Sequence, residues 1–155
     1  MLDNLIRSGS DYMNMDNLIE FIKDLGLTQE QMGKIINVKR VTYSAYENYH
    51  ATISLEKLNI IANKYDKSLD FLTGLSRSNN SNFKHIEIDN KKIGQRLKSI
   101  RINLNMSQRQ FAKELKVSKS ILSYYETGSI RITVLVLIEY SKLTGKSIDW
   151  LCCKK

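Results

Sequence analysis

The chain has 155 residues, 42% of them hydrophobic and 26% charged, which fits one ordinary soluble domain or two very small ones. No apolar run reaches the roughly 18 residues of a membrane-spanning helix, and the first residues lack the pattern of a secretory signal, so we expect no membrane association. The net charge of +8 favours an acidic partner such as nucleic acid, while the adjacent Cys152 and Cys153 favour a reducing, cytoplasmic location over a disulfide framework.

The absence of proline and the presence of only seven glycines predict helices that run uninterrupted between short turns. When the chain is shifted by 79 positions, residues 18–72 align with residues 97–151 without a gap, and fifteen of the 55 aligned pairs are identical. The sequence therefore predicts an all-α protein built from two tandem copies of one small domain. We expect an N-terminal tail at 1–15, a first unit at 16–75, a linker at 76–90 and a second unit at 91–155.

Capping residues predict where the helices of the first unit begin. Thr28 with Gln31 three residues later forms the pattern of a capping box, in which a hydroxyl and an amide each satisfy an unpaired backbone N–H. Ser54 and Ser68 stand at the expected starts of the fourth and fifth helices, while Lys39 occupies the corresponding position of the third. Each unit is thus expected to contain five short helices.

The second unit repeats these signals. Asp89 or Asn90 is expected to cap a first helix that runs to about Asn103, and Ser107 with Gln110 repeats the capping box. The other expected caps are Ser118, Thr133 and Ser147, and the third helix is expected to end at Gly128 in a left-handed conformation.

The third helix of the second unit, within "SKSILSYYETG", separates into two faces. Leu122 and Tyr125 are spaced to pack inward. The residues left on the outer face are Lys119, Ser120, Ser123 and Tyr124. A tight "KVS" turn joins this helix to the one before it, an arrangement that fits a helix-turn-helix whose second helix enters the major groove of DNA.

Both units resemble the Cro/repressor (XRE-type) helix-turn-helix family of phage and bacterial regulators. The resemblance is carried by "MSQRQFAKELKVSKSILSYYETG" and "IEYSKLTGKSIDWL" in the second unit, and by "LTQEQMGKIINVKRVTYSAYENY" and "LNIIANKYDKSLDFL" in the first. It implies two tandem five-helix, lambda-repressor-like domains, binding to double-stranded DNA and regulation of transcription. It also implies a buried pair between Arg101 and Glu126.

The resemblance implies that a glutamine near the start of the second helix, Gln108 or Gln29, contacts phosphate. It places the groove-reading positions at Lys119, Ser120, Ser123 and Tyr124 and, in the first unit, at Arg40, Val41, Ser44 and Ala45. The predicted DNA-binding residues are Gln108, Arg109, Ser118, Lys119, Ser120, Ser123, Tyr124, Thr127 and Arg131 in the second unit, and Gln29, Lys39, Arg40 and Ser44 in the first.

The two units are not equivalent. Residues 16–75 carry 7 Lys/Arg against 8 Asp/Glu, whereas residues 93–155 carry 12 against 4. Beside the expected phosphate-facing glutamine the second unit has Arg109 where the first has Glu30, and Arg101 is replaced by Ile22. The second unit is therefore expected to be the main DNA reader, and the first either a weakened reader or a protein-binding module.

The fourth helix of the second unit is apolar nearly all round, since Leu135, Val136 and Ile138 replace Glu56, Lys57 and Asn59 of the first unit. We expect these three side chains to be buried in an interface, either in a homodimer or against the first unit, or else beneath the C-terminal "LCCKK".

Two functions remain open. The first is a sequence-specific transcriptional regulator, most simply a repressor of phage, plasmid or bacterial genes. The alternative is a protein-interaction adaptor, such as an antitoxin, anti-repressor or phage-borne inhibitor, that holds a protein partner with the first unit and uses the second for autoregulation. An enzyme is disfavoured, because no catalytic arrangement is present, and no metal site or cofactor is expected.

Overall fold

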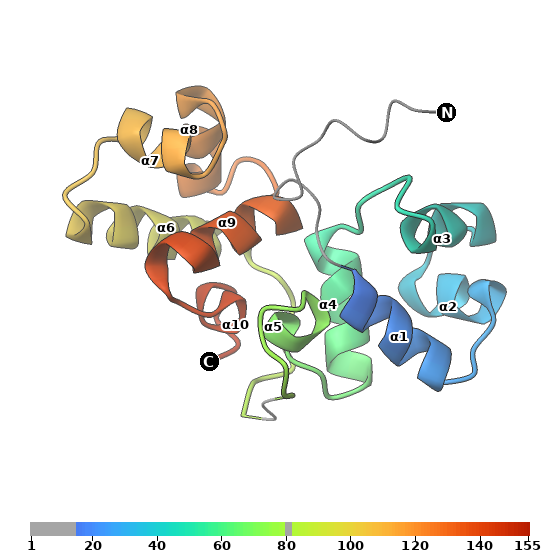
Figure 1. Cartoon of the computed structure of the whole chain (residues 1–155). Helices are drawn as coiled ribbons and strands as arrows, with labels where there is room; N and C mark the ends of the chain where they lie inside the picture. Colours follow the sequence, from blue (N-terminus) through green and yellow to red (C-terminus); the bar gives the residue numbers. More distant parts are fainter. Residues whose placement is uncertain (1–14, 80–81) are drawn as a thin grey trace.

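The computed structural model describes residues 15–79 and 82–155, and within these ranges the chain consists of ten helices and no strand (Figure 1). The helices of the first unit are α1 (Asp16–Asp24), α2 (Gln29–Ile36), α3 (Arg40–Glu47), α4 (Leu55–Lys64) and α5 (Leu69–Leu72). Those of the second are α6 (Asn90–Asn103), α7 (Gln108–Glu114), α8 (Lys119–Thr127), α9 (Val134–Thr144) and α10 (Ile148–Leu151). The predicted all-α fold with two tandem five-helix units is confirmed. The predicted tail, apart from Met15, lies outside the described residues.

The helices begin at the predicted caps. Thr28 Oγ1 accepts from the N–H of Gln31 at 3.2 Å while Gln31 Oε1 accepts from the N–H of Thr28 at 2.8 Å, and Ser107 and Gln110 repeat both bonds at the same distances. The side chains that also accept from their own helix are Ser54, Ser68, Asp89, Ser118, Thr133 and Ser147. Lys39 precedes α3 without a side-chain cap, so this helix begins with one fewer stabilising bond than α8.

Gly128 ends α8 at φ 72°, in the predicted left-handed conformation. Its counterpart in the first unit, Tyr49, adopts nearly the same backbone at φ 58°, which is unfavourable for a residue with a side chain. The Tyr49 hydroxyl donates a hydrogen bond to Asp16 at the start of α1, and this bond raises the pKa of Tyr49. This bond connects the end of α3 to α1. Gly128 has no side chain, so the second unit has no equivalent bond.

Each unit has its own apolar core. Leu18, Met32 and Leu58 are buried in the first unit, and their counterparts Leu97, Phe111 and Leu137 are buried in the second. In the second unit α6 packs unusually close to α8, since a methyl group on Gly94 would lie 2.3 Å from the carbonyl oxygen of Tyr125. The first helix of this unit therefore fixes the position of α8 directly.

The segment between the units is held at several points. The Asn79 Oδ1 accepts from the N–H of Ser68 at 2.8 Å, and the carbonyl of Ile86 accepts from the side chains of Asn59 and Asn63 at 2.7 and 3.0 Å. The N–H of Lys84 donates to the carbonyl of Lys154 at 2.7 Å. The described part of the linker is thus packed against α4 and the C-terminus, and these hydrogen bonds fix its path between the units.

Candidate nucleic-acid interface

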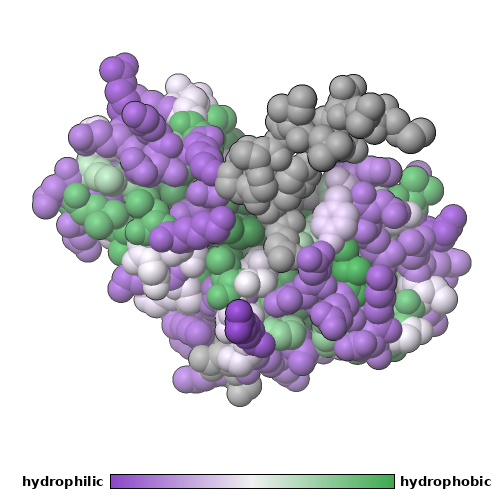
Figure 2. All heavy atoms as spheres, viewed as in Figure 1, coloured by the Kyte–Doolittle hydropathy of each residue, from purple (hydrophilic) through white to green (hydrophobic). Residues whose placement is uncertain are grey.

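The candidate interface is built around α8. Leu122 and Tyr125 are buried as predicted, while Lys119 and Ser120 are exposed and Ser123 is half-buried. The Tyr124 side chain is 51% exposed. A short helix therefore presents a cation, hydroxyls and one aromatic ring to solvent, and hydrophilic side chains cover most of the molecular face shown in Figure 2.

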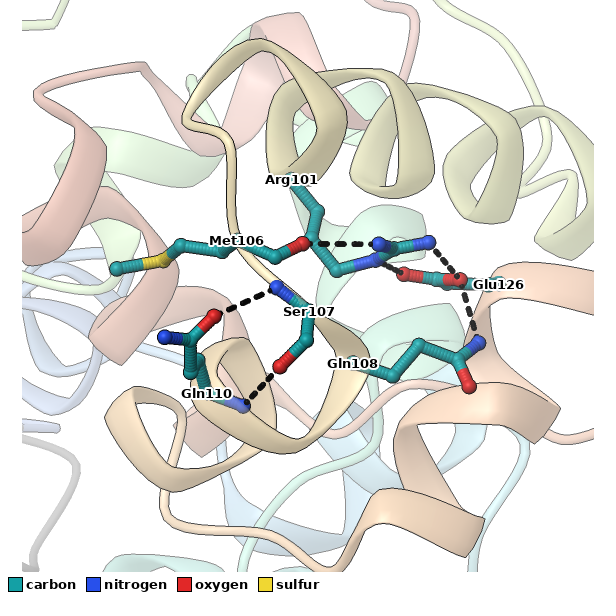
Figure 3. A network of polar contacts seen from close by, with 6 residues as sticks. All are labelled: Arg101, Met106, Ser107, Gln108, Gln110 and Glu126. Carbon is teal, nitrogen blue, oxygen red and sulfur yellow. Dashed lines mark hydrogen bonds and ion pairs between the residues drawn. The ribbon is translucent and has the colours of Figure 1, made fainter.

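A buried polar network fixes α8 in place (Figure 3). Arg101 of α6 donates from Nε and Nη2 to the two carboxylate oxygens of Glu126 in α8, at 2.5 and 3.1 Å. Its Nη1 donates to the carbonyl of Met106 at 3.0 Å. The side chains of Arg101 and Glu126 are only 12% and 3% exposed, which confirms the predicted buried pair. Both charges are compensated at close range, as burial requires.

The same carboxylate positions the start of α7. Gln108 Nε2 donates to Glu126 Oε2 at 2.9 Å, so the side chain that the family resemblance assigns to phosphate is held against α8. Arg109, the next residue, is exposed. Because the capping box already orders the backbone at Ser107, the first turn of α7 is fixed by both its backbone and its first side chain.

The remaining predicted DNA-binding residues of the second unit are exposed and also make contacts within the chain. They are Ser118, Thr127 and Arg131. Ser118 caps α8, with its Oγ accepting from the N–H of Ile121 at 3.2 Å. The Thr127 hydroxyl donates to the carbonyl of Tyr124 and lies 2.6 Å from the Ser129 hydroxyl. Arg131 Nε lies 3.1 Å from Glu56 Oε1 of the first unit. The ion pair of Arg131 thus joins the two units, a contact that the sequence pattern does not predict.

The first unit holds its own third helix differently. Gln29 Nε2 donates to Glu47 Oε2 at 2.7 Å, the counterpart of the bond from Gln108 to Glu126. Ile22 is buried where the second unit has its arginine, so no guanidinium reaches Glu47 from α1. Instead, Arg40 Nη1 donates to Gln29 Oε1 at 3.1 Å. The predicted phosphate contact Gln29 therefore has both ends of its amide engaged.

Other predicted positions of the first unit are accessible. Lys39 is exposed, and Ser44 is half-buried and accepts from Asn48 Nδ2 at 3.2 Å. Val41, on the same helix, is 74% exposed. The acidic Glu30 pairs with Lys34 at 3.0 Å, and this pair lowers the pKa of Glu30, so the side chain remains anionic beside Gln29. The exposed face of α3 is thus apolar at Val41, and the cationic Lys39 lies just before the helix.

The predicted interface residues lie on α9. Val136 and Ile138 are 6% and 7% exposed within the single chain, and Leu135 is half-buried. The chain itself therefore covers most of this apolar surface, and burial in a homodimer stays a prediction.

In the described ranges no helix is both long and apolar enough to cross a membrane, and no three His, Cys, Asp or Glu side chains are grouped as metal ligands. A family model described as helix-turn-helix matches the chain twice, over residues 18–72 and residues 97–151. No curated protein matches the chain, and no solved structure does. The two matched segments are the same two segments that align when the sequence is shifted by 79 positions.

Proposed function

The chain belongs to this helix-turn-helix family of DNA-binding transcription regulators, and we propose that it is a sequence-specific repressor whose second unit is the main reader of double-stranded DNA. The observation that carries the proposal is the solvent-facing side of α8, where Lys119, Ser120 and Tyr124 are exposed on a helix that Arg101 and Glu126 anchor from beneath. A helix held in one orientation can present donors and acceptors to base edges in a fixed register.

Charge supports the assignment of the main reader. Residues 93–155 contain 12 Lys/Arg and 4 Asp/Glu, whereas residues 16–75 contain 7 and 8, so the second unit attracts phosphates more strongly than the first. Each phosphate that a cation neutralises releases counterions, and the binding constant falls with salt accordingly. Binding through α7 and α8 is therefore expected to weaken steeply as salt is raised.

The experiment is selection of bound duplexes from random DNA with the full-length chain. Lys119→Ala should relax base preference at one or two positions, at about 1–3 kcal/mol for a lost base contact, whereas Gln108→Ala should weaken all sequences to a similar extent. Lys34→Ala is a matched control, since Lys34 is an exposed helix lysine that pairs with Glu30. The assignment is contradicted if Lys119→Ala leaves the selected motif unchanged.

A second candidate function, the protein-interaction adaptor, has its own support in the first unit. A pocket of about 390 Å³ lies on this unit and is lined by Asp16, Ile19, Glu20, Lys23, Asp24, Glu47 and Tyr49. Four of these seven side chains are carboxylates, so the pocket would attract a basic protein segment and repel nucleic acid. It is lined by α1, the end of α3 and the turn after it.

Selection with a chain altered only in the first unit separates the two candidates. Arg40→Ala with Val41→Ala removes the outer side chains at the start of α3 and leaves the buried Tyr43 and Tyr46 in place. If the first unit is a weakened DNA reader, the selected site becomes shorter or less defined. If it serves only as an adaptor, the selected motif is identical to that of the unaltered chain.

A further inference from the structure

The two units meet through a pair of reciprocal contacts. The Asp149 carboxylate of α10 accepts from the N–H groups of Leu69 and Asp70 at the start of α5, both at 3.0 Å. In return, Asp70 Oδ1 accepts from the N–H of Ile148 at the start of α10, at 2.9 Å. Each short helix, which its own serine caps at a third N–H, thus also receives acceptors for its first-turn N–H groups from the other unit. Both carboxylates are buried, so the bonds are not shared with solvent.

These contacts obey the internal repeat. The offset of 79 that aligns the units converts Asp70 into Asp149 and Leu69 into Ile148, so the bond from Leu69 to Asp149 and the bond from Ile148 to Asp70 are counterparts. An interface in which residue i contacts j while the equivalent of j contacts the equivalent of i is the signature of two-fold symmetry. The units are therefore arranged as the halves of a symmetric dimer, although one chain supplies both.

Further contacts fix this arrangement. Lys154, at the end of the second unit, is 0% exposed, and its Nζ donates to Asn59 Oδ1 and Asn63 Oδ1 of α4, both at 2.6 Å. Burial lowers the pKa of Lys154, because it disfavours the charged form of the side chain. Arg131 pairs with Glu56, so the beginnings of α9 and α4 also meet. These polar contacts have partners at fixed places on the other unit, so they specify one docked arrangement.

A two-fold arrangement places equivalent helices at the same end of the axis. Figure 1 shows α3 and α8 on opposite sides in the upper part of the molecule, with α5 and α10 next to each other below them. Both helices that carry predicted groove-reading residues therefore lie at one end, away from the helix pair that joins the units. Helix-turn-helix dimers use this kind of geometry to place two recognition helices in successive major grooves.

We propose that a single chain acts as a covalent pseudo-dimer and occupies, as a monomer, a bipartite DNA site whose two half-sites differ in sequence and have one fixed spacing. The inference rests on the proposed DNA-binding function and adds the form of the target. The half-sites differ because the two helices differ: α8 presents Lys119, Ser120 and Tyr124, and the corresponding residues of α3 are Arg40, Val41 and Ala45. Docking, and not linker length, sets the spacing.

The test uses the full-length chain and the duplex selected from random DNA. We expect two unlike half-sites about one helical turn apart and a complex that contains one chain, measured by light scattering after gel filtration. Insertion of about 5 or about 10 base pairs between the half-sites should lower affinity by about tenfold or more, since rigid docking tolerates neither. Tolerance of the full-turn insertion alone would show flexibly joined units and overturn the inference, as would a palindrome of one half-site bound by two chains.

Docking can also be tested without DNA. Asp70→Ala with Asp149→Ala removes both carboxylate acceptors between the units and leaves the capping residues Ser68 and Ser147 in place. Small-angle X-ray scattering should then show a more extended particle, with unchanged helix content by circular dichroism. Glu87→Ala, which removes an exposed carboxylate of the linker, is the matched control and should leave the scattering unchanged. Scattering of the unaltered chain that does not fit the docked arrangement would refute the inference even if DNA is bound. If no duplex is enriched in the selection, the DNA-binding proposal fails, and the bipartite target fails with it.

Discussion

Replacing Arg101 by isoleucine gives the second unit the residue that the first unit has at the same place, Ile22. The change leaves the buried Glu126 carboxylate with Gln108 as its remaining side-chain partner. Removing one member of a buried ion pair costs about 3–5 kcal/mol. Because the Gln108 bond persists and isoleucine adds apolar packing, we expect a loss at the lower end, about 3 kcal/mol of unfolding free energy.

The assay is urea unfolding followed by the fluorescence of Trp150, the chain's single tryptophan, which lies in α10 of the second unit. The double variant Arg101→Ile with Glu126→Gln should recover most of the loss, since it leaves no buried charge unpaired. The reverse change, Ile22→Arg, should also destabilise the chain, because Ile22 is 2% exposed in the core of the first unit and the change loses its apolar packing. A loss below about 1 kcal/mol in Arg101→Ile would show that the network does not anchor α8.

Two further predictions concern the contacts of α5 and α6. Burial and the neighbouring Asp149 carboxylate raise the pKa of Asp70 from 3.8 to about 6. Between these two pH values the folded chain therefore holds a proton on Asp70 that the unfolded chain has released. Stability from this group is therefore present below about pH 4 and is lost as pH rises through 6, and Asp70→Asn should flatten this part of a curve of melting temperature against pH. An unchanged slope would argue against the buried position of Asp70. Gly94→Ala should cost about 3 kcal/mol or more in urea unfolding, because its methyl group would lie 2.3 Å from the Tyr125 carbonyl, whereas Ser99→Ala on the exposed side of α6 should change stability by less than about 0.5 kcal/mol. A tolerated Gly94→Ala would show that α6 does not set the position of α8.

The local structure could be predicted from sequence because its signals are local. Ser107 and Gln110 form a capping box from positions three residues apart, and Gly128 ends α8 where a left-handed residue is needed. The pair of Arg101 and Glu126 is separated by 25 residues and was implied by the family resemblance, not by any local pattern. The repeat extended the capping box to the first unit, but not the ion pair or the terminal glycine, whose counterparts there are Ile22 and Tyr49.

The docking of the units could not be read in the same way. Asp70 and Asp149 stand in the first turn of short helices, where an acidic residue is favourable for its own helix, so nothing marked them as caps for another. Lys154 lies in a charged C-terminal "KK" that suggests solvent exposure, yet it is fully buried against Asn59 and Asn63. Both cases depend on contacts between residues about 80 to 95 positions apart, which hydrophobic periodicity does not encode.

The central claim is that α8 reads base pairs in the major groove. The most direct measurement is protection of the selected duplex from methylation at guanine N7, a major-groove atom, by the full-length chain and by Lys119→Ala. We predict protection in the half-site assigned to the second unit, which Lys119→Ala reduces while protection in the other half-site remains. Protection that is identical for the two proteins, or absent from the major groove altogether, would contradict the account.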